Sequence, residues 1–187
     1  ETVYGLAGNA LNPETVAKIF ETKKRPQFNP LIVHVPDSDI AKKYVLNFPD
    51  HAEKLARHFW PGPLTLVLQK KMIIPDLVSA GLDTVGLRCP DHHLTRELLS
   101  KLSFPLAAPS ANLFGRVSPT KPEHVNEQLG QYISYILDGG TCSIGIESTI
   151  VGFDEYTPVI YRLGGLAVEK ISEVVGEVKV NTHSSSN

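Results

Sequence analysis

The 187-residue sequence is poor in cysteine, with only Cys89 and Cys142. Two cysteines without metal-type spacing argue against a disulfide scaffold and against a cysteine-based metal site. They favour free thiols in a reducing compartment, so we expect a cytoplasmic protein. Long apolar runs are also missing, since no run approaches the roughly 20 residues of a membrane-spanning helix. We therefore expect no membrane association.

A large excess of charge of either sign is missing too. Lys and Arg number 18, Asp and Glu 20, and the formal net charge is −2. A generally basic nucleic-acid-binding domain would carry a clear positive excess, so this balance argues against one. The small local excess of positive charge lies early, around Lys23, Lys24 and Arg25.

What the chain does have is a distinctive stretch from Ser103 to Thr120. Its apolar run Phe104–Ala108 predicts a buried strand, which then breaks at Pro109 into small hydroxyl and amide residues. Open α/β sheets bind ligands at such strand ends, and short Ser and Asn side chains can approach a nucleotide closely. An ordinary strand-to-helix loop remains the alternative, because these are also turn residues.

A helix is predicted from Asn12, with Pro13 at its first position and its end near Lys23 to Pro26. Lys23 and Arg25 follow its apolar face and could clamp phosphates, Lys as a point charge and Arg as a fork. The alternative is that these cations merely stabilise the helix C-terminus against its macrodipole.

Several predicted strands end in polar residues. His34 lies in the apolar run Pro30–Val35, Arg88 ends the strand at 83–88, and Arg162 ends the strand at 158–161. Ser148 opens the strand that follows Gly145. Taken one at a time, His34 could be a core histidine and Arg88 a surface ion pair. Taken together, these residues favour one shared pocket for an anionic ligand.

Further along the chain, Thr120–Glu123 predicts a capping box for a helix that runs to about Leu129. Alternation over Tyr132–Leu137 predicts a strand. We found no P-loop, no Ser-His-acid triad and no metal cage in the sequence. Arginine guanidinium groups and small hydroxyls favour the binding of an adenosine phosphate over a hydrolytic active site.

Five motifs in order resemble the threonylcarbamoyl-AMP synthase family, with its YrdC-like domain. They are Glu1–Leu6 (ETVYGL), Lys23–Pro26 with Asn29–Leu31, Trp60–Thr65 (WPGPLT), Ala108–Asn112 (APSAN) with Gly115 and Ser118–Thr120, and Glu147–Ile150 (ESTI). None of the motifs is conclusive alone. The ordered set is highly specific and covers nearly the whole chain.

The resemblance implies a single α/β (α+β) domain over residues 1–180, with a twisted mixed open sheet flanked by helices and a central positively charged cavity. It implies an enzyme that joins L-threonine, bicarbonate or CO2, and ATP into L-threonylcarbamoyladenylate and pyrophosphate. Mg2+ would be bound through ATP and not by side chains, and no organic prosthetic group is implied. The downstream partner would be a tRNA threonylcarbamoyltransferase complex, which modifies adenosine beside the anticodon.

The resemblance also implies a role for individual residues. Thr2, His34, Arg88, Ala108 and Ser148 would surround threonine, and Arg25, Asn29, Thr84, Ser110, Ser118 and Arg162 would contact ATP. The catalytic candidates are the Lys-x-Arg pair, Lys23 and Arg25, and the Ser-x-Asn pair, Ser110 and Asn112. The family carries an apolar strand and a Pro-Thr pair before the position of Glu1, so we expect residues upstream. Residues 181–187 are expected to form a polar tail or the start of a linker.

Two other functions compete with this interpretation. A double-stranded RNA- or tRNA-binding maturation factor without adenylation activity would need a local basic patch despite the net charge. Weak RNA binding is compatible with either function. A carbamoyl-transfer enzyme of the hydrogenase-maturation type uses a similar domain, but that type is longer and carries zinc-finger-like Cys motifs that this chain lacks.

Overall fold

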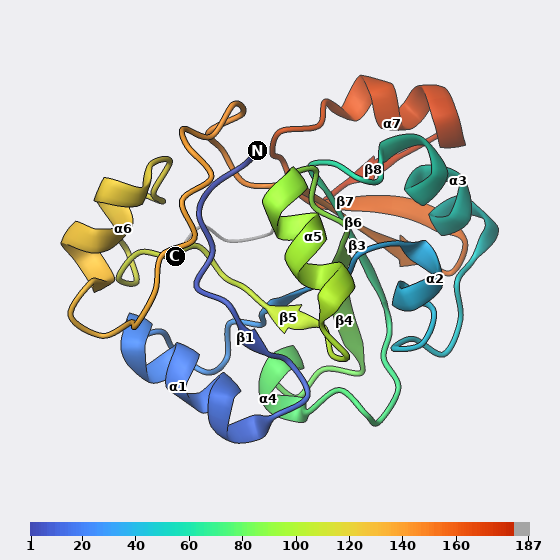
Figure 1. Cartoon of the computed structure of the whole chain (residues 1–187). Coiled ribbons are helices and arrows are strands. Elements are labelled where there is room, and N and C mark those ends of the chain that lie inside the picture. Colours follow the sequence, from blue (N-terminus) through green and yellow to red (C-terminus); the bar gives the residue numbers. More distant parts are fainter. Residues whose placement is uncertain (182–187) are drawn as a thin grey trace.

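An eight-stranded mixed sheet forms the centre of residues 1–181, the part of the chain that the computed structural model describes (Figure 1). The strand order is β1-β5-β2-β4-β3-β6-β7-β8. The strands are β1 (Gly8–Asn9), β2 (Ile32–His34), β3 (Leu64–Gln69), β4 (Thr84–Arg88), β5 (Leu106–Ala107), β6 (Thr149–Asp154), β7 (Thr157–Arg162) and β8 (Lys179–Val180). The pairs β2–β4, β3–β6 and β7–β8 are parallel, and the others are antiparallel. The predicted fold class is therefore confirmed.

The helices are α1 (Pro13–Lys23), α2 (Ser38–Ala41), α3 (Asp50–Phe59), α4 (Asp76–Ser79), α5 (His93–Lys101), α6 (Pro122–Leu129) and α7 (Val168–Val175). Helices α3 and α7 pack together at one end of the sheet, and α1 and α4 pack together at the other (Figure 1). The N-terminal segment runs between α5 and α6 in this view. None of the helices within residues 1–181 is long and apolar enough to cross a membrane.

Alternation along the central strands separates the core from a polar face. In β4, Val85 and Leu87 are buried in the main apolar core, whereas Thr84, Gly86 and Arg88 lie on the opposite face. Successive side chains on a strand point to opposite faces, so five residues supply both layers. The core face packs against α1, α3, α4 and α7, which leaves the other face of the sheet available for a site.

Helix α1 buries a lysine. Its N-terminus is capped by the Asn12 side chain, which accepts a hydrogen bond from Thr15 N at 2.9 Å, as the sequence predicts. The buried residues Val16, Ile19, Phe20 and Lys23 follow the helical i, i+3, i+4, i+7 spacing. Lys23 thus continues the apolar stripe, and its side chain is 1% exposed.

The buried ammonium of Lys23 forms hydrogen bonds with the loop after β5. Its Nζ donates hydrogen bonds to the backbone carbonyls of Ser110 and Asn112. Burial, with a smaller contribution from the charge of Arg25, lowers the pKa of Lys23 to about 8. Lys23 therefore ties the C-terminal end of α1 to a loop that lies 87 residues further along the chain.

Two local predictions are wrong. Residues 132–137 form no strand, because Ile133 and Ile136 are the half-buried positions and lie three apart, packed against the cluster of α6. Helix α6 begins at Pro122 with Lys121 as its N-cap and no side-chain cap bond, so the capping box at Thr120 does not form. Strand β8 was not predicted. Residues 182–187 of the predicted tail lie outside the described residues.

Removing the ammonium of Lys23 should destabilise the fold. We expect Lys23→Met to lower the free energy of unfolding by about 1–3 kcal/mol, because a buried and a part-buried carbonyl lose their donor. Lys18→Met, at an exposed position of the same helix, is the matched control. Urea unfolding of both variants measures the difference, and equal stabilities would show that the Lys23 bonds contribute nothing to folding.

Candidate active site

Five neighbouring strands each place one residue in a single row across the sheet. His34 of β2 pairs with Arg88 of β4, which pairs with Thr65 of β3. Thr65 pairs with Ile150 of β6, and Ile150 pairs with Arg162 of β7. All five residues line one cavity of about 650 Å3, which we call the sheet cavity. The strand register therefore brings together residues up to 128 positions apart.

The floor of the sheet cavity continues along the same face. Ile32, Gly86 and Val67 form a second row two residues from the first, and all three line the cavity. Gly86 carries no side chain, and an added Cβ would lie 3.1 Å from Thr65 Cγ2. A glycine inside a strand often marks a place where a ligand approaches the backbone closely. The middle of this floor is open for that reason.

Most of the predicted site residues meet in this cavity. Ten of the thirteen line it: Thr2, Arg25, Asn29, His34, Thr84, Arg88, Ala108, Ser110, Ser148 and Arg162. They come from the N-terminal segment, the turn after α1, the strands β2, β4 and β7, the loop after β5 and the residue before β6. The sequence separates these positions widely, and only the sheet register and the N-terminal segment bring them together.

Three predicted residues, Lys23, Asn112 and Ser118, do not line the sheet cavity. Lys23 donates hydrogen bonds to the backbone of the loop after β5 and lies outside the cavity. The Asn112 amide donates to Leu113 O at 2.8 Å and to Arg116 O at 2.7 Å, which closes the loop on itself. Ser118 donates to the carboxylate of Glu147, which does line the cavity. These three side chains position parts of the wall.

Arg88 is buried beneath the N-terminal segment. Its Nε donates to Gly62 O at 3.1 Å, its Nη1 donates to Thr2 Oγ1 at 2.9 Å, and its Nη2 pairs with the Glu1 carboxylate. A guanidinium has five N–H donors, so two can still serve a ligand. Burial lowers the pKa of Arg88 and the charge of Glu1 opposes this, and the guanidinium stays protonated.

Arg162 and Ser148 form a second polar group. Arg162 donates to Ser148 O through Nε at 3.1 Å and through Nη2 at 2.7 Å. Ser148 Oγ lies 2.8 Å from Thr65 Oγ1, and these two hydroxyls share a hydrogen bond. The hydroxyls are held rigidly on the cavity floor, since Ser148 and Thr65 are both buried.

Arg25 completes the cationic wall. Its guanidinium donates to Asn29 O at 3.3 Å and to Pro30 O at 3.1 Å, so it also shapes the turn after α1. Burial lowers the pKa of Arg25, and the charge of Arg162 lowers it further. Within residues 1–181, neither Arg25 nor Arg162 forms an ion pair with a carboxylate. Two neighbouring guanidiniums without carboxylate partners favour a polyanionic ligand.

His34 is neutral at the end of β2. Burial, helped by the charge of Arg88, lowers the pKa of its imidazole to about 3. Its Nδ1 is buried and has no hydrogen-bond partner within residues 1–181. The Nδ1 atom of this neutral imidazole can therefore donate or accept one hydrogen bond to a ligand. The sequence pattern alone left open whether His34 was a core residue.

Sequence reasoning missed three wall residues: Glu1, Thr65 and Glu147. Each lies inside a motif that was singled out for its neighbours, and only the register or the fold of the N-terminal segment shows what it faces. Burial alone would raise the pKa of Glu147, but the Ser118 hydrogen bond and the charge of Arg162 lower it overall. Across the described residues, no group of three or more His, Cys, Asp or Glu side chains could hold a metal ion.

The neutral state of His34 predicts a pH dependence of folding. The folded-state pKa lies below the ordinary 6.5, so between these values the unfolded chain binds a proton that the folded chain does not. Stability should therefore fall as pH drops below 6.5, by up to about 1.4 kcal/mol per pH unit from this group. Urea unfolding at pH 7.5, 6 and 5 measures this change in the free energy of unfolding. His34→Asn should lose less stability over this range, and identical losses would contradict the assignment.

Known proteins resemble this chain over almost its whole length. The model of the Sua5/YciO/YrdC family, described by the words "Telomere recombination", matches residues 1–164. The chain is 46% identical to the threonylcarbamoyl-AMP synthases of Pyrococcus abyssi, over 181 residues, and of Bacillus subtilis, over 182 residues. Each alignment covers 97% of this chain and 53% of the relative, so the chain spans about half the length of these relatives.

A solved structure agrees with this match. The crystal structure of P. abyssi Sua5 complexed with L-threonine superposes with a TM-score of 0.94 at 46% identity. It covers 97% of this chain and 53% of that one. Sequence motifs, strand order and family match coincide, and the chain belongs to the Sua5/YciO/YrdC family.

Proposed function

We propose that this chain forms L-threonylcarbamoyladenylate and pyrophosphate from L-threonine, bicarbonate or CO2, and ATP. The observation that carries the proposal is the row from His34 to Arg162 on the floor of the sheet cavity. The two ends of this row carry different side chains, so the cavity has two chemically different halves. Arg25 and Arg162 lie in one half, and Arg88, Thr2 and His34 lie in the other. Relatives named threonylcarbamoyl-AMP synthase, and the L-threonine complex of P. abyssi Sua5, support it.

The first half suits the triphosphate of ATP. The carbamate oxygen forms a bond to the α-phosphorus, and the bond between the α- and β-phosphates breaks as pyrophosphate leaves. The attack brings two anions together, and the guanidiniums of Arg25 and Arg162 reduce their repulsion and stabilise the leaving pyrophosphate. Mg2+ would arrive with ATP through its phosphate oxygens, which are the ligands that this ion prefers.

The second half suits the amino acid. Two N–H groups of Arg88 can bind the α-carboxylate of threonine side by side, which a planar fork does well. The neutral His34 and the hydroxyls of Thr2 and Ser148 can bind the amine or the hydroxyl of threonine. A side-chain nucleophile is unnecessary, because holding the carbamate beside the α-phosphate supplies much of the rate.

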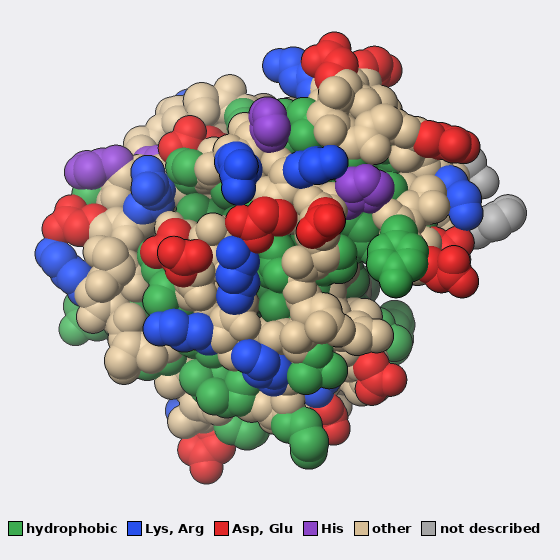
Figure 2. Space-filling view, turned by 90° about the vertical axis from the view of Figure 1, so that its right-hand side faces the viewer, with side chains coloured by type: hydrophobic (Ala, Val, Ile, Leu, Met, Phe, Trp, Pro, Cys, Tyr) green, Lys and Arg blue, Asp and Glu red, His purple; other side chains and the backbone are tan. Residues whose placement is uncertain are grey.

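The product would be passed to a tRNA threonylcarbamoyltransferase complex for modification of adenosine beside the anticodon. An RNA-binding role without adenylation gains no support from the face in Figure 2, where Lys and Arg side chains are interspersed with Asp and Glu. Lys42 pairs with Glu53 at 2.9 Å and Lys70 with Asp76 at 2.8 Å, so these cations are already partly neutralised. Non-specific RNA binding needs a continuous positive field.

Pyrophosphate release is the direct test of the activity. We expect release from ATP only when L-threonine and bicarbonate are both present, because the carbamate is the attacking group. Each component is omitted in turn, and mass spectrometry identifies threonylcarbamoyl-AMP in the complete mixture. Release that does not depend on threonine would indicate plain ATP hydrolysis, and no release from the complete mixture would leave the proposal without support.

A pair of conservative substitutions tests the division of the cavity. We expect Arg88→Lys to weaken threonine binding by about 10- to 150-fold, equivalent to roughly 1.5–3 kcal/mol for a hydrogen bond to a charged group. Its ATP affinity should change less than about twofold. Arg25→Lys should show the reverse, with ATP weakened and threonine spared. Calorimetry with each ligand measures both, and a loss of ATP affinity in Arg88→Lys would place that arginine in the nucleotide half.

A further inference from the structure

Glu147 carries the one carboxylate among the described residues that line the sheet cavity. It directly precedes Ser148 and β6, and its backbone carbonyl accepts a hydrogen bond from Gly165 N at 2.8 Å. Gly164 packs so closely against it that an added Cβ would lie 2.4 Å from Glu147 O. The backbone of Glu147 is therefore held firmly at the wall of the cavity. In the proposed reaction the arginines of this wall have roles, whereas Glu147 has none.

The carboxylate of Glu147 is charged and can still bind a ligand. The Ser118 hydroxyl donates to its Oε1 at 2.5 Å. Burial acts to raise the pKa of Glu147, but the hydrogen bonds from Ser118 and from its own backbone N–H, together with the charge of Arg162, lower it overall. A carboxylate has about four acceptor positions, so the Ser118 and backbone bonds leave some of them for a ligand.

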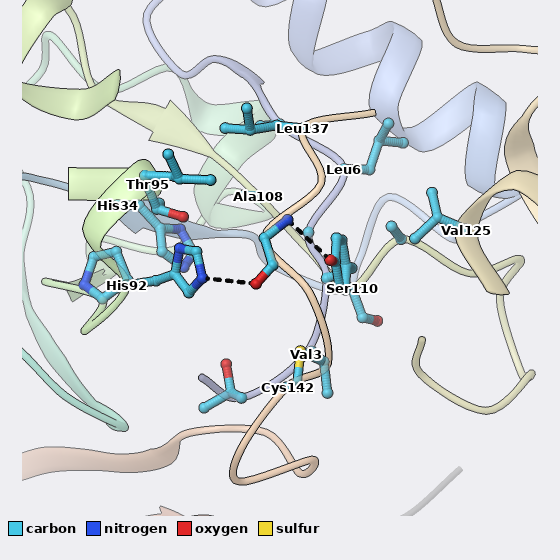
Figure 3. Close-up of a pocket in the computed structure, with 18 of the residues that line it drawn as sticks. Val3, Leu6, His34, His92, Thr95, Ala108, Ser110, Val125, Leu137 and Cys142 are labelled. Carbon is cyan, nitrogen blue, oxygen red and sulfur yellow. Dashed lines mark hydrogen bonds between the residues drawn. The ribbon is translucent and has the colours of Figure 1, made fainter. Parts of the chain in front are cut away.

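The residues that influence this carboxylate belong to the nucleotide half of the cavity. Ser118 is assigned to ATP by the family resemblance, and Arg162 is assigned to the phosphates by the proposed function. Within residues 1–181, Arg162 forms no ion pair with Glu147, so neither charge is neutralised by the other. Two of the residues assigned to threonine, His34 of β2 and Ala108 of the loop after β5, come from other segments (Figure 3). This arrangement puts Glu147 beside the triphosphate.

A charged carboxylate beside a triphosphate needs a cation between them. Like charges repel, and most strongly where water is partly excluded, so Glu147 alone would weaken the binding of ATP. Mg2+ prefers oxygen ligands and is usually bound by one or two carboxylates together with substrate phosphates and water. One carboxylate is therefore a fitting donor set for a metal that ATP brings. A cluster of three or more protein ligands, which the described residues lack, is not required.

We propose that Glu147 is a ligand of the Mg2+ that ATP carries into the site, and that Ser118 positions the carboxylate for this role. The inference rests on the proposed function and adds to it a protein ligand for the metal, which the family resemblance does not assign. The cavity would then select the magnesium complex of ATP over free ATP, because free ATP meets the uncompensated charge of Glu147.

Calorimetry with a non-hydrolysable ATP analogue, in the presence of Mg2+ or of EDTA, tests the proposal. Glu147→Gln keeps an oxygen that can accept from Ser118 but removes the charge. We expect this variant to bind the Mg2+ complex about tenfold or more weakly than the unaltered chain, and the metal-free analogue about threefold or more tightly. Glu127→Gln, at an exposed position of α6 that does not line the sheet cavity, is the matched control and should behave like the unaltered chain.

The opposite signs of these two changes distinguish a metal ligand from a residue that only supports the wall. A purely structural role would make Glu147→Gln weaken the binding of both forms of the analogue by the same factor. That result would overturn the proposal, as would unchanged affinity for both forms. If the unaltered chain binds neither form of the analogue, the proposed function fails as well.

A second measurement uses the unaltered chain and does not depend on the folding of a variant. Mn2+ replaces Mg2+ in the complex with the analogue, and the glutamates of the chain carry 13C at their carboxyl carbons. Electron–nuclear double resonance should then show the strong 13C coupling of a directly bound carboxylate, and Glu147 is the one glutamate among the described residues lining the sheet cavity. The absence of this coupling would overturn the proposal.

Discussion

Alternation of side chains along the central strands is the constraint on which the rest of this structure depends. In β2 and β4 every second residue is apolar and buried against helices, and the residues between them face the cavity. A one-residue change of register would move Arg88 into the core and Leu87 into the cavity. The same apolar pairs that stabilise the sheet therefore also hold His34, Arg88 and Arg162 in one row.

The four cations in and beside the cavity are mostly held by backbone carbonyls. Lys23, Arg25 and Arg162 donate to backbone carbonyls, which bind a cation without cancelling its charge. Arg88 alone among these four pairs with a carboxylate, that of Glu1. Within residues 1–181, three arginines and the single carboxylate of Glu147 line the sheet cavity, and such an excess of cations would attract a polyanionic ligand. The cationic residues thus contribute both to the shape of the loops and to the chemistry.

Much of the fold was predictable because its signals are local. The Asn12–Pro13 helix start, the apolar runs of β2 and β3, and the strand with Arg88 at its end all follow from short patterns. Thirteen site residues were predicted from the motifs and the family resemblance, and ten of them line the sheet cavity. The resemblance named residues, but it did not say which of them face the cavity.

What sequence reasoning missed depends on contacts between distant segments. The hydrogen bonds of Lys23 were not predicted, because its partners lie 87 and 89 residues away, although its place on the apolar stripe of α1 signalled its burial. The strand expected at 132–137 lacks a partner strand, since its half-buried residues pack on α6.

The central claim is that one register-defined cavity holds the nucleotide and the amino acid side by side. A crystal structure of the chain with a non-hydrolysable ATP analogue and L-threonine tests it most directly. The account predicts phosphate oxygens bound by Arg25 and Arg162, and the threonine carboxylate bound by Arg88, with both ligands above Gly86 and Thr65. Phosphates bound away from both arginines, or a threonine carboxylate bound away from Arg88, would contradict it.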